Sequence, residues 1–155
     1  MAHYRLFYIM QQSYKIWIKL FIAFILLAIG GFIYYTFRTK ELIMFDWADS
    51  LGLSKYIDTT RARLSHIEIP VFIKYCLPNA LWCASYIVAT DTLIATDNHR
   101  LEWAISLPIV AAILEVLQAF YLIPGTFDIM DLCCFLIPTA IYIAYYKSRY
   151  YEENS

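Results

Sequence analysis

The sequence predicts an all-α polytopic membrane protein, a helix bundle with four transmembrane helices and a surface-lying segment between the first and second. Two features of the 155-residue chain predict this class: 61% of its residues are hydrophobic and only 16% are charged. A soluble domain is nearer half apolar and a quarter charged. One small core cannot enclose this apolar excess, so lipid is the expected solvent for much of the chain. We expect a single integral membrane domain over residues 1–155.

The composition also excludes several functional classes. The net charge is −1, and the chain has no basic patch or zinc-ligand spacing, which argues against a nucleic-acid partner. It has four glycines and lacks the nucleophile-elbow, zinc-protease and phosphate-loop motifs, so we expect no bound cofactor. Its four cysteines form no C-x-x-C motif, and a cysteine in an apolar helix is usually a small hydrophobic residue.

The first predicted span covers about residues 16–37. Its length is sufficient to cross a bilayer. A cleaved signal peptide is the alternative, but no A-x-A cleavage pattern follows the apolar run, so we expect an uncleaved helix. Gly30 and Gly31 should either kink this helix or let a neighbouring helix approach closely.

Residues 38–77 form the only extended polar region, and we expect them to connect the first two spans outside the membrane. Apolar and charged side chains are mixed there in a way that suits a short helix on the membrane surface between Asp49 and Leu64. Asp49 or Ser50 is the expected N-cap. We favour a solvated connector over a binding module.

The second predicted span, residues 78–95, is short and unusually polar. Four of its side chains fall within about 40° of one another at 100° per residue; they are Asn79, Cys83, Tyr86 and Thr90. This face should contact other helices, where Asn and Tyr find hydrogen-bond partners. The span ends at a short charged turn that contains Asp91, Asp97, His99 and Arg100.

The third predicted span, residues 101–123, places Glu115 on a face of small and polar residues. That face also carries Ala104, Pro108, Ala111, Gln118 and Ala119. Small residues let a partner helix come close, so we expect Glu115 to lie within the bundle rather than in lipid. The fourth predicted span covers residues 127–146 and is interrupted by Pro138.

Charge alone gives a weak prediction of orientation. With four spans, both termini share a side with the turn at residues 98–100. That side carries six Lys and Arg residues: Arg5, Lys15, Lys19, Arg100, Lys147 and Arg149. The other side also carries six: Arg38, Lys40, Lys55, Arg61, Arg63 and Lys74. The short turn between the last two spans has acids and no cations, which favours both termini in the cytoplasm.

Acids and an amide gather around the turn between the third and fourth spans. Glu115 and Gln118 are three residues apart and so share a helix face, and Asp128 and Asp131 follow the turn. Ionisable groups at membrane depth are costly and usually functional. The candidate site therefore consists of Glu115, Gln118, Asp128 and Asp131, with Asn79 and Tyr86 as its walls.

These carboxylates have three interpretations. A carboxyl group in apolar surroundings binds its proton more tightly, which suits a general acid or base, with Asp128 and Asp131 as partners of Glu115. The three acids could instead supply oxygen ligands to a divalent cation. In the structural interpretation, which we favour for Asp128 alone, Asp128 stabilises a helix start that Thr126 caps. In this interpretation, Glu115 and Gln118 only form hydrogen bonds to a neighbouring helix. For Glu115, however, we favour a functional role over this structural one.

The same residues resemble a known family. Glu115-x-x-Gln118, followed by the P-G-T-F-D-x-x-D sequence that ends at Asp131, is similar to the VanZ-like family of small bacterial membrane proteins. The L-P-N-A-L-W segment at residues 77–82 resembles the entrance helix of that family. The similarity covers roughly residues 77–140. The chain departs from the family pattern at Gly125-Thr126, where the family often has Arg, and after Asp131, where Asn and Gly are replaced by other residues.

This resemblance implies a role in the bacterial cell envelope, and the founding member of the family is linked to teicoplanin resistance. We therefore expect an inner-membrane protein that binds or acts on an envelope lipid or its headgroup, with membrane lipid as its partner. A second hypothesis is a non-enzymatic small subunit that assembles with larger membrane proteins. A third, ranked last, is an oligomeric ion pathway lined by Glu115 and Tyr86.

Overall fold

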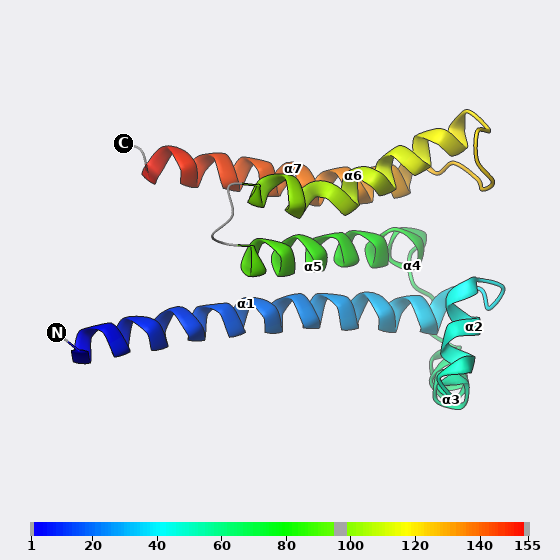
Figure 1. Ribbon diagram of the computed structural model, residues 1–155. Helices are drawn as coiled ribbons and strands as arrows, with labels where there is room; N and C mark the ends of the chain where they lie inside the picture. Colours follow the sequence, from blue (N-terminus) through cyan, green and yellow to red (C-terminus); the bar gives the residue numbers. More distant parts are fainter. Residues whose placement is uncertain (1, 95–98, 154–155) are drawn as a thin grey trace.

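The computed structural model describes residues 2–94 and 99–153, and all regular secondary structure in these ranges is helical, which confirms the predicted all-α class (Figure 1). The described helices are α1 (Ala2–Phe37), α2 (Ile43–Ser50), α3 (Ser54–Leu64), α4 (Val71–Tyr75), α5 (Leu77–Leu93), α6 (Arg100–Ala119) and α7 (Ile129–Glu153).

The long helices α1, α5, α6 and α7 lie side by side, each antiparallel to the one before it (Figure 1). Helix α5 lies between α1 on one side and α6 and α7 on the other, and it packs against all three. Both ends of the chain lie at the end of the bundle where α5 connects to α6. Helices α2 to α4 and the loop at residues 120–128 lie at the opposite end.

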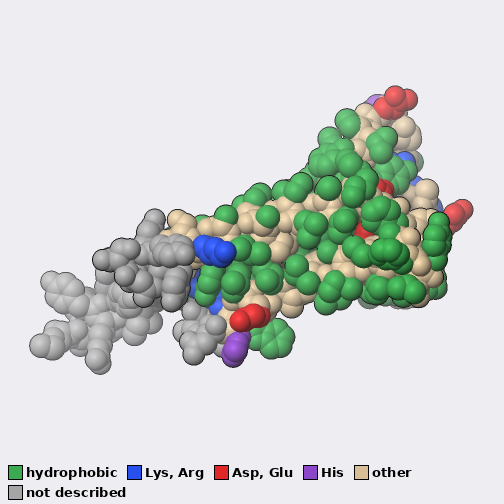
Figure 2. All heavy atoms as spheres, turned by 90° about the horizontal axis from the view of Figure 1, so that it is seen from above, with side chains coloured by type: hydrophobic (Ala, Val, Ile, Leu, Met, Phe, Trp, Pro, Cys, Tyr) green, Lys and Arg blue, Asp and Glu red, His purple; other side chains and the backbone are tan. Residues whose placement is uncertain are grey.

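Three segments are long and apolar enough to cross a membrane: Ser13–Phe37, Arg100–Ala119 and Ile129–Arg149. Their outer faces leave large apolar side chains exposed; for example, Phe21 is 64% exposed and Ile141 66%. Figure 2 shows hydrophobic side chains along the length of the bundle, with charged side chains mainly toward its ends and on a segment that projects sideways. These features indicate a small, helical, multi-pass membrane protein.

The predicted boundaries differ from the helices at the turn between α6 and α7. The third span was predicted to reach residue 123, but α6 ends at Ala119 and residues 120–128 form a loop. Tyr121 has a φ of 56° and Gly125 a φ of 137°, so the backbone leaves the helical conformation here. The fourth helix begins at Ile129 and continues to Glu153, beyond the predicted end at residue 146. The last residue of the predicted span 78–95 lies outside the described part of the chain.

A glycine lets α5 pack closely on α1. Gly30 is buried, and a Cβ atom built there would lie 2.6 Å from the indole Nε1 of Trp82 and 3.2 Å from the carbonyl oxygen of Pro78. The same indole donates a hydrogen bond of 3.3 Å to the carbonyl of Leu27. Helix α1 continues unbroken through this position. Of the two predicted roles, close approach is therefore confirmed at Gly30, while the space around Gly31 is open.

The connector at residues 38–77 contains three helices, α2, α3 and α4, and the segment from Asp49 to Leu64 is not the single helix predicted there. Gly52, with a φ of 71°, separates α2 from α3. The predicted N-cap at Asp49 or Ser50 is wrong, because both residues lie inside α2, and the carboxylate of Asp49 instead accepts a hydrogen bond of 2.8 Å from Ser54 at the start of α3. Arg61 of α3 donates hydrogen bonds of 2.8 Å to two carbonyl groups at the end of α1, and so fixes the connector to the bundle.

The close contact at Gly30 gives a first prediction. Gly30→Ala should lower the melting temperature of the purified protein in detergent, because an added methyl group overlaps Trp82 and overpacking costs about 1–3 kcal/mol. Gly31→Ala is the matched control: it faces open space and gains up to about 1 kcal/mol of helix propensity. Equal melting temperatures for the two variants would contradict close packing at Gly30.

Candidate functional site

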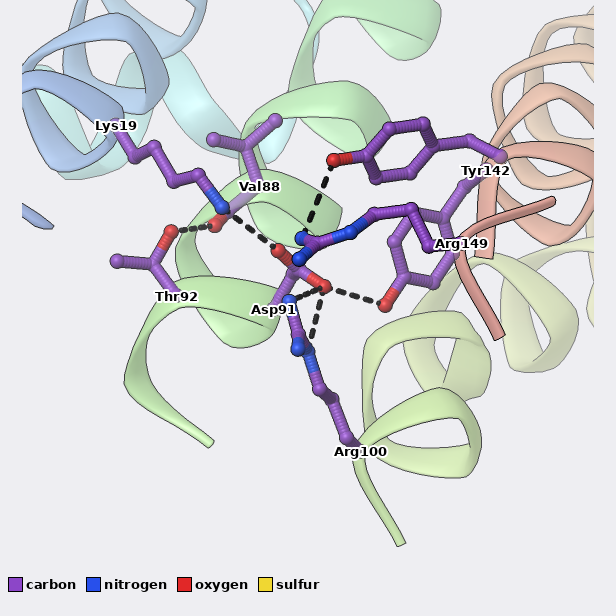
Figure 3. Close-up of polar contacts among 8 residues, drawn as sticks. Lys19, Val88, Asp91, Thr92, Arg100, Tyr142 and Arg149 are labelled. Carbon is purple, nitrogen blue, oxygen red and sulfur yellow. Dashed lines mark hydrogen bonds and ion pairs between the residues drawn. The ribbon is translucent and has the colours of Figure 1, made fainter. Parts of the chain in front are cut away.

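The most connected polar side chain in the described part of the bundle is Asp91, near the end of α5. It is only 5% exposed. Its Oδ1 atom accepts hydrogen bonds from the Tyr142 hydroxyl at 2.8 Å and from Arg100 Nε at 2.7 Å. Lys19 Nζ lies 3.4 Å from Oδ2. In Figure 3 these three side chains point toward the carboxylate from three other helices.

This arrangement follows from where each residue stands on its helix. Asp91 lies in the last turn of α5 and Arg100 is the first residue of α6, so the short connection brings them together. Tyr142 is buried on α7, and Lys19 reaches across from α1. The one carboxylate therefore links all four long helices at one end of the bundle.

Sequence reasoning treated Asp91 only as part of a charged exit turn and missed this cluster. The available signal was an acid that still belongs to the apolar span, with a cation nine residues later. Its remaining partners come from sequence positions 72 and 51 residues away, which no local pattern relates to it. Asp97, from the same predicted turn, lies outside the described residues.

A basic pocket of about 350 Å³ adjoins Asp91. Four of its lining residues are cationic: Lys15, Lys19, Arg100 and Arg149. Figure 3 shows Arg149 from α7 beside the Asp91 cluster, where its guanidinium lies 3.5 Å from the hydroxyl of Tyr145. The other lining residues are Ile16, Asp91, Thr92 and Tyr145.

An apolar groove of about 560 Å³ lies between α1, α5 and α7. Most of its lining is aliphatic: Ile22, Ala80, Leu81, Ala84, Ile87, Val88, Pro138 and Ile141. Lys19, Asp91, Tyr142 and Tyr145 complete it. Because Lys19, Asp91 and Tyr145 also line the basic pocket, the two spaces meet at the Asp91 cluster.

The predicted site around Glu115 is organised by hydrogen bonds to the α6–α7 loop. Glu115 is 8% exposed, as expected for a residue facing the bundle. Its Oε1 atom accepts a hydrogen bond of 2.6 Å from the backbone N–H of Asp128. The Asp128 carboxylate accepts one of 2.8 Å from the backbone N–H of Met130, which stabilises the first turn of α7. Gln118 packs on the backbone of Gly125, where a Cβ atom would lie 2.6 Å from its amide.

The remaining predicted site residues make separate contacts. The amide of Asn79 on α5 donates a hydrogen bond of 2.8 Å to the Asp131 carboxylate on α7. Tyr86 lies elsewhere: its hydroxyl donates to the carbonyl of Trp103 at 3.1 Å and is 2.8 Å from Ser106 Oγ. Trp103 is twelve residues from Glu115 on the same helix, about 18 Å along its axis. Tyr86 therefore bonds near the Asp91 end and does not contribute to the wall predicted for it.

The described acids do not assemble a metal site. Among the described side chains, residues 13–94 and 99–149, no three His, Cys, Asp or Glu groups lie so that they could hold a metal ion. Each acid of the Glu115 corner instead accepts a hydrogen bond from a backbone N–H or a side-chain amide. None of these acids lines either of the two spaces described above.

Three comparisons with known proteins found no match. No family model, no curated protein and no solved structure matches the chain. The resemblance of the Glu115 to Asp131 segment to VanZ-like proteins therefore stays a prediction from its motif.

The Asp91 cluster gives a second prediction. Asp91→Ala should lower the free energy of unfolding by about 3 kcal/mol, because removing one member of a buried ion pair leaves its partners unpaired. Glu102→Gln is the control, since Glu102 pairs with His99 on an exposed surface and its loss should change stability by less than about 0.5 kcal/mol. Thermal or denaturant unfolding in detergent measures both. An Asp91 variant as stable as the control would show that this cluster does not hold the helices together.

The contact between Glu115 and the loop gives a third prediction. Glu115→Gln keeps an oxygen acceptor for the N–H of Asp128 and should preserve the melting temperature. Glu115→Leu removes the acceptor and should cost about 1–2 kcal/mol. The two variants are compared by thermal unfolding. If the melting temperature falls by the same amount in the two variants, Glu115 does not stabilise the fold through its hydrogen bond to the loop.

Proposed function

We propose that this chain is an integral membrane protein with four crossings that binds a membrane lipid in the groove between α1, α5 and α7. The observation that supports the proposal is that an apolar groove adjoins a basic pocket at one of its ends. A lipid has the same two parts, an acyl chain and a polar headgroup. The groove volume of about 560 Å³ also lies within the range of small-molecule binding sites, about 300–1,000 Å³.

The fourth crossing in this proposal is α5. Its 17 residues are at the short end of the range that spans a bilayer, about 17–25. Near one end, Asp91 bonds to the first residue of α6, and near the other, Asn79 bonds to Asp131 in the first turn of α7. Helix α5 therefore extends between the same two levels as its neighbours, which supports a crossing of equal depth.

The length of the groove supports an acyl chain as its occupant. From Asp91 to Ala80, the groove follows α5 over eleven residues, about 17 Å at the rise of an α-helix. Half of a hydrocarbon core of about 30 Å is about 15 Å. The groove therefore has the depth of one leaflet, with its polar end toward the bilayer surface.

We propose a bacterial inner-membrane location with both termini in the cytoplasm, based on the VanZ-like motif and on the short acidic loop between α6 and α7. Four crossings agree with the position of both chain ends at one end of the bundle (Figure 1). The lipid site would then belong to the cytoplasmic leaflet. Chemistry on a lipid by Glu115, Gln118, Asp128 and Asp131 stays a separate hypothesis, under which Glu115→Gln would abolish activity while the fold is kept.

A second candidate function is assembly with larger membrane proteins or with further copies of this chain. It is favoured by α1, because few side chains of its apolar segment Ser13–Phe37 are buried. An apolar face of this extent is suited to a partner helix as well as to lipid. The two functions differ in what fills the groove: an acyl chain in the first, a protein side chain in the second.

A groove-filling substitution tests the lipid-binding proposal. Ala84→Phe should reduce crosslinking to a phospholipid with a diazirine in its acyl chain by about tenfold, which corresponds to about 1.4 kcal/mol of binding energy. Ala140→Phe is the matched control, because Ala140 is exposed on α7 and does not line the groove. Mass spectrometry of the crosslinked peptides is the measurement. Unchanged crosslinking to α5 in Ala84→Phe would overturn the proposal.

A further inference from the structure

We infer that the bound lipid is an anionic phospholipid whose phosphate lies in the basic pocket beside Asp91. This inference rests on the proposed lipid-binding function and adds the class of headgroup. It follows from the charge of the pocket, from its level in the bundle and from the hydrogen bonds that already occupy its polar groups.

The pocket carries an excess of positive charge. Its four cations and one carboxylate, Asp91, give a formal charge of 4 − 1 = +3. Arg100 is committed to Asp91 through two nitrogen atoms, at 2.7 Å and 2.5 Å. Lys19 lies farther from the carboxylate, at 3.4 Å, and its side chain is 40% exposed. Among the described lining residues, cations thus outnumber carboxylates at the edge of an apolar bundle, where an anion is favourable.

The pocket lies at the level expected for lipid headgroups. The three segments able to cross a membrane all begin or end there, at Ser13, Arg100 and Arg149. The pocket also shares Lys19, Asp91 and Tyr145 with the groove, so one molecule can occupy both. A phosphate joined to an acyl chain in the groove would therefore meet lysine and arginine side chains, which donate charge-assisted hydrogen bonds to phosphate oxygens.

The charges of the pocket select against headgroups that carry an ammonium group. Such a headgroup brings a cation, which a nearby carboxylate would have to balance. The Asp91 carboxylate is 5% exposed and already receives hydrogen bonds from Tyr142, Arg100 and Lys19. The hydroxyl of Thr92 is engaged with the carbonyl of Val88 at 2.6 Å. Among the described lining residues, an ammonium group would thus meet four cations and one carboxylate that is already bonded, whereas a phosphate with a neutral headgroup finds donors.

Binding measurements with two lipids test this inference. The purified full chain in detergent is titrated with phosphatidylglycerol and with phosphatidylcholine that have identical acyl chains, and bound lipid is counted by native mass spectrometry. We expect phosphatidylglycerol to bind at least about fivefold more tightly, since one Lys or Arg near an anionic lipid contributes roughly that factor. Arg149→Gln and Lys15→Gln should each remove about fivefold of the phosphatidylglycerol affinity and leave that of phosphatidylcholine unchanged. Lys147→Gln, an equal change of charge outside the pocket, should change neither.

The outcomes separate the headgroup inference from the proposed function. Equal affinity for the two lipids, with both lost in Ala84→Phe, overturns the anionic headgroup and keeps lipid binding. Affinities that Ala84→Phe leaves unchanged overturn the proposed function itself. Complete displacement of phosphatidylglycerol by millimolar inorganic phosphate would indicate a site for free phosphate and would overturn the lipid headgroup. If Arg149→Gln and Lys147→Gln lose the same affinity for phosphatidylglycerol, general surface charge explains the effect, and the inference is also overturned.

Discussion

The carboxylate of Asp91 is the interaction on which the arrangement of the bundle depends. It is buried near the end of the most central helix and is bonded to a side chain from each of the other three long helices. In a low-dielectric surrounding, such a group is stable only when its partners are in place. Its position therefore determines the relative register of four helices at one end of the bundle. The same requirement concentrates cations there, and these cations form the pocket proposed to receive a phosphate.

Lipid provides no hydrophobic drive between helices, so the bundle must be held by close packing and by hydrogen bonds. Helix α5 supplies both. On the α1 side, Trp82 covers Gly30, and Ser85 donates a hydrogen bond of 2.7 Å to the carbonyl of Ala23. On the other side, Tyr86 bonds to α6 and Asn79 to α7. The unusual polarity of this short helix follows from its central place. Five of its side chains form a hydrogen bond to a neighbouring helix: Asn79, Trp82, Ser85, Tyr86 and Asp91.

The two ends of the bundle differ in structure. At the end with the termini, lysines and arginines surround one buried acid and border the apolar groove. At the other end, Glu115 and Asp128 hold the loop that joins α6 to α7, and the connector covers the end of α1. Acids there accept hydrogen bonds from the backbone, which restrains a loop containing Gly125 in a conformation unfavourable for other residues. This restraint keeps α7 aligned as a wall of the groove.

The sequence by itself determined the helical class, the membrane environment and the burial of Glu115, because these depend on composition and on spacing along one helix. It also indicated Gly30 as a site of close approach and the stripe from Asn79 to Tyr86 as a packing face. Only the tertiary structure decided which polar groups meet. Asp91 gathers partners from positions 19, 100 and 142, and Tyr86 bonds far from Glu115 although both were assigned to one site. Sequence periodicity shows on which face of a helix a residue lies. It does not show at which level a neighbouring helix places the partner residue, because that level depends on how far the helices are shifted along one another.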